Sequence, residues 1–159
     1  MRLAQKVTLA LAIACLSLTV TAATPDPVVK RMLDAKGTPF EIDEDGDYKI
    51  LVNYKSEGRT QLVFVRSVVE TYGKQRVREV WSYGYQADKD QFSSLVANRL
   101  LEASNKVKLG SWVKQSKAAV FVVKVSAEAS ADELDNAIDA AAAAADEMEK
   151  ELTEGRDEF

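Results

Sequence analysis

The stretch Tyr48-Lys49-Ile50-Leu51-Val52-Asn53-Tyr54 decides the fold of this chain, because its side chains alternate in character along the backbone. Every second residue is apolar or aromatic, and this set is Tyr48, Ile50, Val52 and Tyr54. A period of two residues is typical of a β-strand that buries one face. The stretch therefore predicts a strand from residue 48 to residue 54.

Three further stretches have strand character, at residues 60–71, 76–85 and 118–125. Glu57-Gly58 and Tyr72-Gly73-Lys74 separate the first three strands, and glycine at such positions is typical of tight turns. Short turns join antiparallel neighbours. The sequence therefore predicts an antiparallel β-meander.

Two helices are predicted ahead of the last strand. Asp26-Pro27 is a favourable helix start and Gly37 a favourable end, which places a short amphipathic helix at residues 27–36. A second helix lies between the third and fourth strands and ends between Asn105 and Gly110. Its predicted buried stripe consists of Phe92, Leu95, Val96, Leu100 and Ala103.

A third helix is predicted after the last strand. Ser130-Ala131-Asp132-Glu133 has the pattern of a capping box, and an apolar stripe then runs from Leu134 to Leu152. The alanines at 140–145 favour a helix that approaches its neighbours closely, with a low-complexity tail as the alternative. The order of elements predicts one α+β domain at residues 24–159, with helices packed on an antiparallel sheet.

Residues 1–23 have the pattern of a secretory signal peptide. Arg2 and Lys6 supply a positive start, residues 7–20 are uncharged, and cleavage is expected near Ala23. The uncharged run is shorter than the roughly 20 residues of a membrane-spanning helix, so a permanent membrane anchor is the disfavoured alternative. The chain is therefore predicted to be periplasmic or secreted.

Cys15 leaves a second processing route open, in which it is the lipidated first residue of a lipoprotein. Ala12 stands where leucine is usual, and the sequence stays apolar after the cysteine, so cleavage near Ala23 is the preferred interpretation. Cleavage also removes Arg2 and Lys6, which changes the net charge from −4 to −6. This sign argues against binding to nucleic acid.

The acidic stretch Phe40-Glu41-Ile42-Asp43-Glu44-Asp45-Gly46-Asp47-Tyr48 has two interpretations. Asp43, Asp45 and Asp47 match the first positions of a calcium loop, but Tyr48 and Tyr54 occupy the positions that need glycine and glutamate. Asp45-Gly46 is a strong hairpin signal and suits a type I′ turn. A β-hairpin without bound metal is therefore the prediction.

The composition argues against catalysis. The sequence contains no histidine, and its single cysteine is Cys15, so the commonest general base, a thiolate nucleophile and the usual zinc ligands are absent from the mature chain. A carboxylate pair drawn from Asp47, Glu70 and Glu79 is the remaining alternative. We predict neither enzymatic activity nor a cofactor.

Trp81, Tyr83 and Tyr85 alternate along the third long strand and are predicted to share one face. They are interpreted as core, with contact to a partner protein as the alternative, because tryptophan and tyrosine are enriched at interfaces. Val80, Ser82 and Gly84 on the opposite face suit solvent or a covering helix. The neighbouring basic side chains of Lys74, Arg76 and Arg78 are interpreted as a solvated strand surface.

The order of several motifs resembles the YbjN domain family of bacterial sensory transduction regulators. The resemblance covers about residues 26–153. It rests on the first helix and on Gly37-Thr38-Pro39-Phe40 with the acidic stretch that follows, Gln61-Leu62-Val63-Phe64-Val65, Arg78-Glu79-Val80-Trp81-Ser82, Leu100-Leu101-Glu102-Ala103-Ser104-Asn105 and Lys108-Leu109-Gly110-Ser111-Trp112.

This family looks like the chaperones of type III secretion, so the resemblance implies a chaperone-like α+β fold and a homodimer that binds another polypeptide. It supplies no catalytic residues. Many relatives of this family work in the cytoplasm, and the predicted signal peptide is a feature in which this chain differs from them. The expected function is thus a periplasmic protein-binding or chaperone-like accessory protein. The alternative is a carrier of a small apolar ligand between sheet and helices, lined by Trp81 or Trp112.

Overall fold

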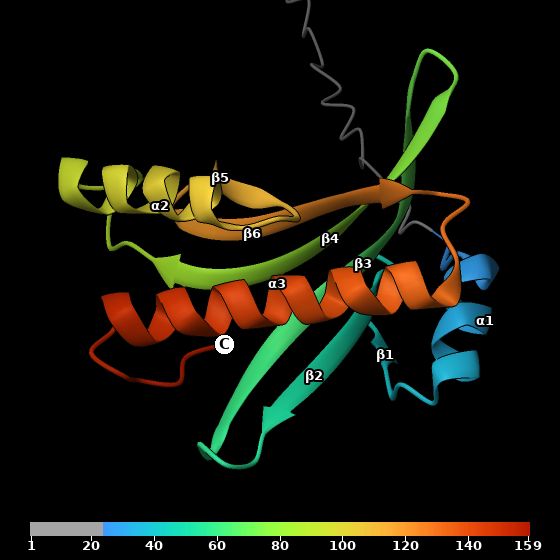
Figure 1. Cartoon of the computed structure of the whole chain (residues 1–159), viewed down its shortest axis with the longest axis horizontal. Helices are drawn as coiled ribbons and strands as arrows, with labels where there is room; N and C mark the ends of the chain where they lie inside the picture. The colour runs from blue at the N-terminus through green and yellow to red at the C-terminus, as the bar shows by residue number, and fades with distance from the viewer. Residues whose placement is uncertain (1–23) are drawn as a thin grey trace, which may run out of the picture.

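The computed structural model of the chain describes residues 24–159 (Figure 1). The predicted signal peptide, with Cys15 and the cleavage site near Ala23, lies outside the described residues. Within residues 24–159, no helix has the length and apolar character needed to cross a membrane.

Six strands form one antiparallel sheet in the order β1-β2-β3-β4-β6-β5. The strands are β1 (Glu41–Ile42), β2 (Tyr48–Tyr54), β3 (Arg59–Tyr72), β4 (Gln75–Gln86), β5 (Ser111–Gln115) and β6 (Ala118–Ser126). The predicted meander is confirmed for β2 to β4, and all four long strands lie within about one residue of their expected bounds. The edge strand β5 was not predicted.

Three helices accompany the sheet: α1 (Pro27–Lys36), α2 (Ser94–Lys106) and α3 (Ala131–Leu152). The longest, α3, crosses the sheet, and α1 lies beside its first turns (Figure 1). The side chain of Asp26 accepts a hydrogen bond from the Val28 amide, and Gly37 ends α1 with φ 68°. Ser130 and Glu133 form the predicted capping box of α3. The α+β prediction is therefore confirmed.

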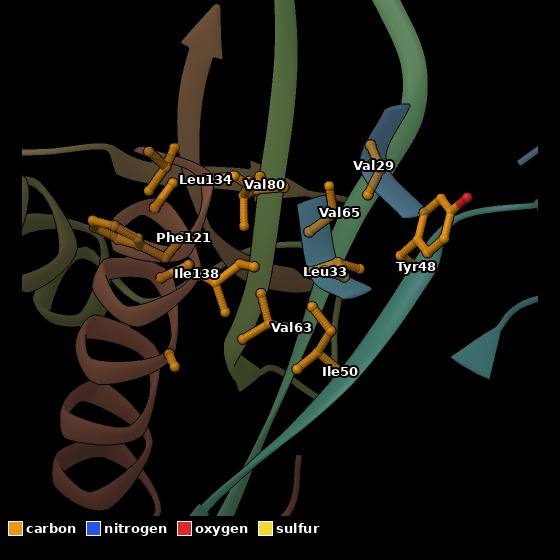
Figure 2. Packing of buried hydrophobic residues seen from close by; sticks show 14 residues of the cluster. Val29, Leu33, Tyr48, Ile50, Val63, Val65, Val80, Phe121, Leu134 and Ile138 are labelled. Carbon is orange, nitrogen blue, oxygen red and sulfur yellow. The ribbon is translucent and has the colours of Figure 1, made fainter. Parts of the chain in front are cut away.

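The main core lies between α1, α3 and one face of the sheet (Figure 2). Alternate residues of β2, β3, β4 and β6 point into it, and its buried members are Val29, Leu33, Tyr48, Ile50, Val63, Val65, Val80, Phe121, Val123, Leu134, Ala137, Ile138, Ala141 and Ala142. Several of these residues are alanines of α3, whose short side chains let the helix lie close to the strands. The packed helix is confirmed, and the low-complexity tail is wrong.

The second helix differs from its prediction. Its buried residue is Leu100, which packs with Ala119 and Met148 on the helix-bearing face of the sheet. Phe92 precedes the helix, and Leu95 is 80% exposed although it was expected in the buried stripe. The helix therefore buries a narrower stripe than the sequence pattern indicates.

Candidate functional site

The predicted aromatic row of β4 is divided by a β-bulge at Gly84. Tyr83 pairs with Val120, whereas Tyr85 pairs with the adjacent residue Ala119, so β4 has one extra residue. A bulge reverses the alternation of side chains beyond it. Tyr85 accordingly packs against Leu100, Ala119 and Met148 on the helix-bearing face. Its ring contacts that of Phe92 at 5.9 Å between ring centroids. The prediction that all three aromatic residues share one face is wrong for Tyr85.

Trp81 and Tyr83 lie together on the face of the sheet that carries no helix among the described residues. They pack against buried Val120 and Val122 of β6. Val80 and Ser82, which are completely buried, point to the opposite face beneath α3. The covering helix is therefore on the side of the small residues, and the two aromatic residues shield the helix-free face.

Both aromatic side chains already have close partners. The Arg66 guanidinium lies 4.2 Å from the Trp81 ring centroid, and the indole N–H donates to the carboxylate of Glu79 at 2.8 Å. Tyr83 contacts Phe64 edge-on and stacks on Phe159 at 6.0 Å between ring centroids. These contacts leave Trp81 and Tyr83 only partly exposed, so they form a satellite core more than an open binding patch.

A more open apolar region lies where α2 runs beside the edge strand β5. A groove of about 200 Å³ is lined there by Phe92, Ala97, Leu100, Leu101, Trp112, Val113 and Lys114. Leu101 is 67% exposed and Val113 is 38% exposed. Among the described strands β5 pairs only with β6, so its outer edge has no strand partner, and of its outward backbone groups the Trp112 N–H is bonded to the Ser104 hydroxyl of α2. We define this region, the β5 edge with its lining residues, as the edge groove.

Sequence reasoning missed the edge groove because β5 is short and lacks alternation. Gly110, which precedes β5, was predicted as the exit from a helix, and Trp112 only as a lining residue of a possible ligand cavity. The signal that marks the site is a set of apolar residues, Leu101, Leu109 and Val113, which stay exposed on both sides of a turn. Such exposure is visible only once α2 and β5 are placed side by side.

Trp112 closes the inner wall of this region. Its ring contacts Phe121 at 5.3 Å between centroids, and its backbone N–H donates to the Ser104 hydroxyl at 2.9 Å. A cavity of about 90 Å³ lies between Trp112, α2 and α3. Because one water molecule takes up about 30 Å³, this cavity suits a few solvent molecules at most.

The acidic loop forms the predicted hairpin, with Ile42 paired to Tyr48. The turn is not type I′, because Gly46 has φ 81° but Asp45 does not have a positive φ. Asp43 organises the loop instead: its carboxylate accepts hydrogen bonds from the amides of Asp45 and Asp47 at 3.0 and 2.8 Å. The described residues contain no cluster of three or more metal-ligating side chains, here or elsewhere.

The three carboxylates considered for catalysis have separate surroundings. Asp47 is buried, and burial raises the pKa of its carboxyl group. The carboxylate accepts a hydrogen bond from the Ser67 amide at 2.7 Å and forms an ion pair with Arg66 at 3.0 Å. Glu79 is held by Trp81 and by Lys124 at 3.2 Å. Glu70 is exposed near the end of β3. Asp47 thus stabilises the fold at the β3 irregularity between Val65 and Val69.

Two buried ion networks were also missed by sequence reasoning. In the first, Arg78 pairs with Asp26 and donates to the carbonyl groups of Arg66 and Ser67 at 2.6 and 3.2 Å. Arg78 is 3% exposed, so its interpretation as solvated surface is wrong. Partial burial alone would raise the pKa of Asp26. Hydrogen bonds from the Val28 amide and from Arg78 outweigh burial and hold this pKa below its ordinary value.

The second network joins β3 to α3. Arg59 donates from Nε to Asp146 and from Nη2 to Glu149, both at 2.7 Å. Glu149 is completely buried, and this burial raises the pKa of its carboxyl group in spite of the hydrogen bonds it accepts. Arg59 is 8% exposed. A charged cluster so completely removed from water is stable only when all its members are paired.

Comparison with protein-family models, with curated proteins and with solved structures found no match for this chain. The resemblance to the YbjN domain family therefore stays a prediction, and function is argued from the geometry of the molecule.

Proposed function

We propose that this protein is a non-enzymatic periplasmic binding or chaperone-like accessory protein of the YbjN type, which binds extended segments of other polypeptides at the edge groove. The observation that carries the proposal is the juxtaposition of an unpaired sheet edge with exposed apolar side chains. Leu101 of α2, which is 67% exposed, and Trp112 of β5 line a groove of about 200 Å³ beside that edge.

An extended peptide that joins β5 as an additional strand gains backbone hydrogen bonds from the unpaired edge. Its alternate side chains point to opposite faces of the sheet, so every second one is directed at the apolar lining between β5 and α2. Backbone pairing is independent of peptide sequence, whereas the groove selects for apolar side chains. This combination suits partly unfolded clients, which expose both features.

The proposed lack of enzymatic activity is supported by the residues themselves. The sequence has no histidine, and the mature chain has no cysteine once Cys15 is removed. The buried carboxylates Asp47, Asp146 and Glu149 are occupied by ion pairs and by backbone amides. A turnover that depends on any of these carboxylates would contradict the proposal.

The carrier alternative has less support. A site for a small ligand is usually about 300–1,000 Å³, whereas the cavity beside Trp112 is about 90 Å³. Trp81, the other expected lining residue, lies on the helix-free face and not between sheet and helices. The edge groove is better suited to one or two side chains of a longer chain.

The test compares two leucines of α2 that differ in position. Leu101 lines the edge groove, whereas Leu95 is equally a surface leucine, 80% exposed, that does not line it. Binding of the mature chain to a fluorescently labelled, permanently unfolded polypeptide, reduced and carboxymethylated α-lactalbumin, is measured by anisotropy. Leu101→Glu is expected to weaken binding at least tenfold, and Leu95→Glu to change it less than twofold.

Equal effects of the two substitutions would show that general surface hydrophobicity, and not the edge groove, holds the probe. No binding of the unchanged protein would overturn the proposal. Compartment is tested separately by fractionation of cells that express the full chain, followed by mass determination of the product. Export with cleavage near Ala23 predicts a periplasmic protein that begins near Thr24 and therefore lacks Cys15.

A further inference from the structure

The last residues of the chain occupy an opening in the sheet. β3 and β4 pair from Val63 and Ser82 onward, but the residues before Val63 in β3 have no partner in β4. After α3 the chain reverses direction and returns beneath that helix (Figure 1). We define residues 155–159 as the terminal segment, and the residues of β3, β4 and α3 that contact it as the terminal groove.

Buried charges of the terminal groove hold the backbone of the terminal segment. Nη1 of Arg59 donates to the carbonyl oxygens of Gly155 and Arg156, each at 3.0 Å. Oε1 of Glu149 accepts from the amides of Glu158 and Phe159, the latter at 3.0 Å. With the segment in place Glu149 is completely buried, and a 2.7 Å ion pair with Arg59 holds its carboxylate between the guanidinium and the segment.

Two side chains of the terminal segment add selectivity. The Asp157 carboxylate accepts hydrogen bonds from the backbone amide and hydroxyl group of Thr60, at 3.2 and 3.3 Å. The ring of Phe159 stacks on Tyr83, with an interplanar angle of 26°. The terminal groove therefore favours a peptide segment that has an acidic residue two positions before an aromatic residue.

The connection between α3 and the terminal segment is short and strained. Glu154 has φ 58° and Gly155 has φ 84°, so two consecutive residues are left-handed. A residue other than glycine in this conformation costs about 1–2 kcal/mol. Straightening the connection relieves this strain but breaks the hydrogen bond from the Gly155 amide to the Lys150 carbonyl oxygen at 2.9 Å. A short strained hinge is the feature that favours exchange of segments between copies.

We propose that the terminal groove is a peptide-binding site that takes residues 155–159 from a second copy of this chain, so that two molecules exchange their terminal segments. The occupant is argued from the contacts already made: a second copy supplies the same backbone groups, the same carboxylate and the same phenyl ring. Exchange keeps all of these contacts and relaxes Glu154. The extent of exchange depends on protein concentration, because each chain's own terminal segment competes with that of a second copy. The tethered segment does so at an effective concentration in the millimolar range.

Disulfide trapping between separate molecules tests the exchange. The mature chain has no cysteine, so introduced thiols report only on their own positions. One mature chain carries Thr60→Cys and another carries Asp157→Cys. Thr60 is partly buried and Asp157 is exposed, and their side chains contact each other in the terminal groove. After mixing and mild oxidation, the mixed disulfide is measured by mass spectrometry. We expect it to increase with protein concentration and to fall at least fivefold when Phe159→Ala is added to the second chain.

Two controls define the background. Lys74→Cys, exposed in the turn between β3 and β4, replaces Thr60→Cys and measures random collision. A single chain with both Thr60→Cys and Asp157→Cys shows that the geometry allows a disulfide. Mixed product at the level of the Lys74 control, together with efficient intrachain closure in the double variant, would overturn the proposal. Native mass spectrometry of the unsubstituted chain gives an independent reading, since the dimer must be lost with Phe159→Ala.

Discussion

Trp112 occupies the space in which Gly84 lacks a side chain. A Cβ atom built on Gly84 would lie 2.4 Å from Cη2 of the indole and 3.1 Å from the carbonyl oxygen of Ala145 in α3. One glycine therefore lets β5 and α3 approach β4 from two directions. The same residue forms the bulge that turns Tyr85 toward α2.

Gly84→Ala is expected to destabilise the protein by about 1–3 kcal/mol, the usual cost of overpacking a close-packed interior. Gly84 does not have a positive φ, so the cost arises from contact and not from backbone strain. Urea denaturation followed by circular dichroism measures it. In a Trp112→Val background the cost should decrease, since the nearest clashing atoms are removed. An equal cost in both backgrounds would mean that the backbone of α3 sets the limit.

Arg78→Met is expected to lower the free energy of unfolding by about 3–5 kcal/mol, because it leaves a partly buried carboxylate without its partner. The Arg78 side chain is 4% exposed and is paired with Asp26, the residue that begins α1. Arg76→Met is the matched control: Arg76 pairs with Glu128 at 2.7 Å on the surface, with both side chains 58% exposed. Its cost should stay within about 1 kcal/mol. Similar losses for the two variants would contradict the assigned role of Arg78.

Asp146 gives the protein a defined response to acid. Burial alone would raise its pKa, but hydrogen bonds from Lys150 and Arg59 outweigh burial and hold the pKa of Asp146 below the ordinary value of 3.8. A carboxyl group whose pKa is lower in the folded state stabilises that state above pH 3.8, and this stability is lost as the pH falls through the lowered pKa.

Asp146→Asn should therefore be less stable than the unsubstituted protein at pH 6, with the difference shrinking below pH 4. Urea midpoints measured between pH 2.5 and pH 7 test this. Asp139→Asn, a change on the same helix outside the buried network, should leave the pH profile unchanged. A difference between Asp146→Asn and the unsubstituted protein that is constant with pH would show that the carboxylate acts by shape and not by charge.

The acidic loop is expected not to bind calcium with micromolar affinity, because the Asp43 carboxylate is already used by two amides of its own turn. Titration calorimetry of the mature chain with calcium chloride is the measurement. Asp43→Ala should destabilise the hairpin by about 1 kcal/mol, the cost of an unmade hydrogen bond, while Asp43→Asn keeps an acceptor and costs less. Micromolar binding that disappears in Asp45→Asn would contradict this prediction.

Elements with local signals were predicted well. The helix α1 has its cap, its proline and its terminal glycine within the residues Asp26–Gly37, so its bounds agree with the prediction. The long strands alternate for more than one period, and glycine-containing turns separate the first three. These patterns depend on residues near one another in sequence, which is why a single chain is enough to read them.

Features set by distant contacts were not predicted. The bulge at Gly84 follows from the approach of Trp112, and β5 forms only because β6 offers it an edge. Arg59 and Arg78 appear as ordinary strand residues until α3 and Asp26 arrive beside them. Leu95 completes a helical stripe in sequence, yet its side chain is 80% exposed. The candidate site was missed for the same reason, since α2 and β5 have to be placed together before the edge groove exists.

The Arg59 cluster also affects the order in which the protein folds. Its hydrogen bonds join residues 87 to 97 positions apart, from β3 to α3 and the terminal segment. Contacts so distant in sequence form slowly, because a long loop has to close before they stabilise anything. In a nascent chain that has emerged only as far as β6, the Arg59 partners Asp146, Glu149 and Asp157 are absent, so the Arg59 cluster forms only after α3 and the terminal segment have been synthesised.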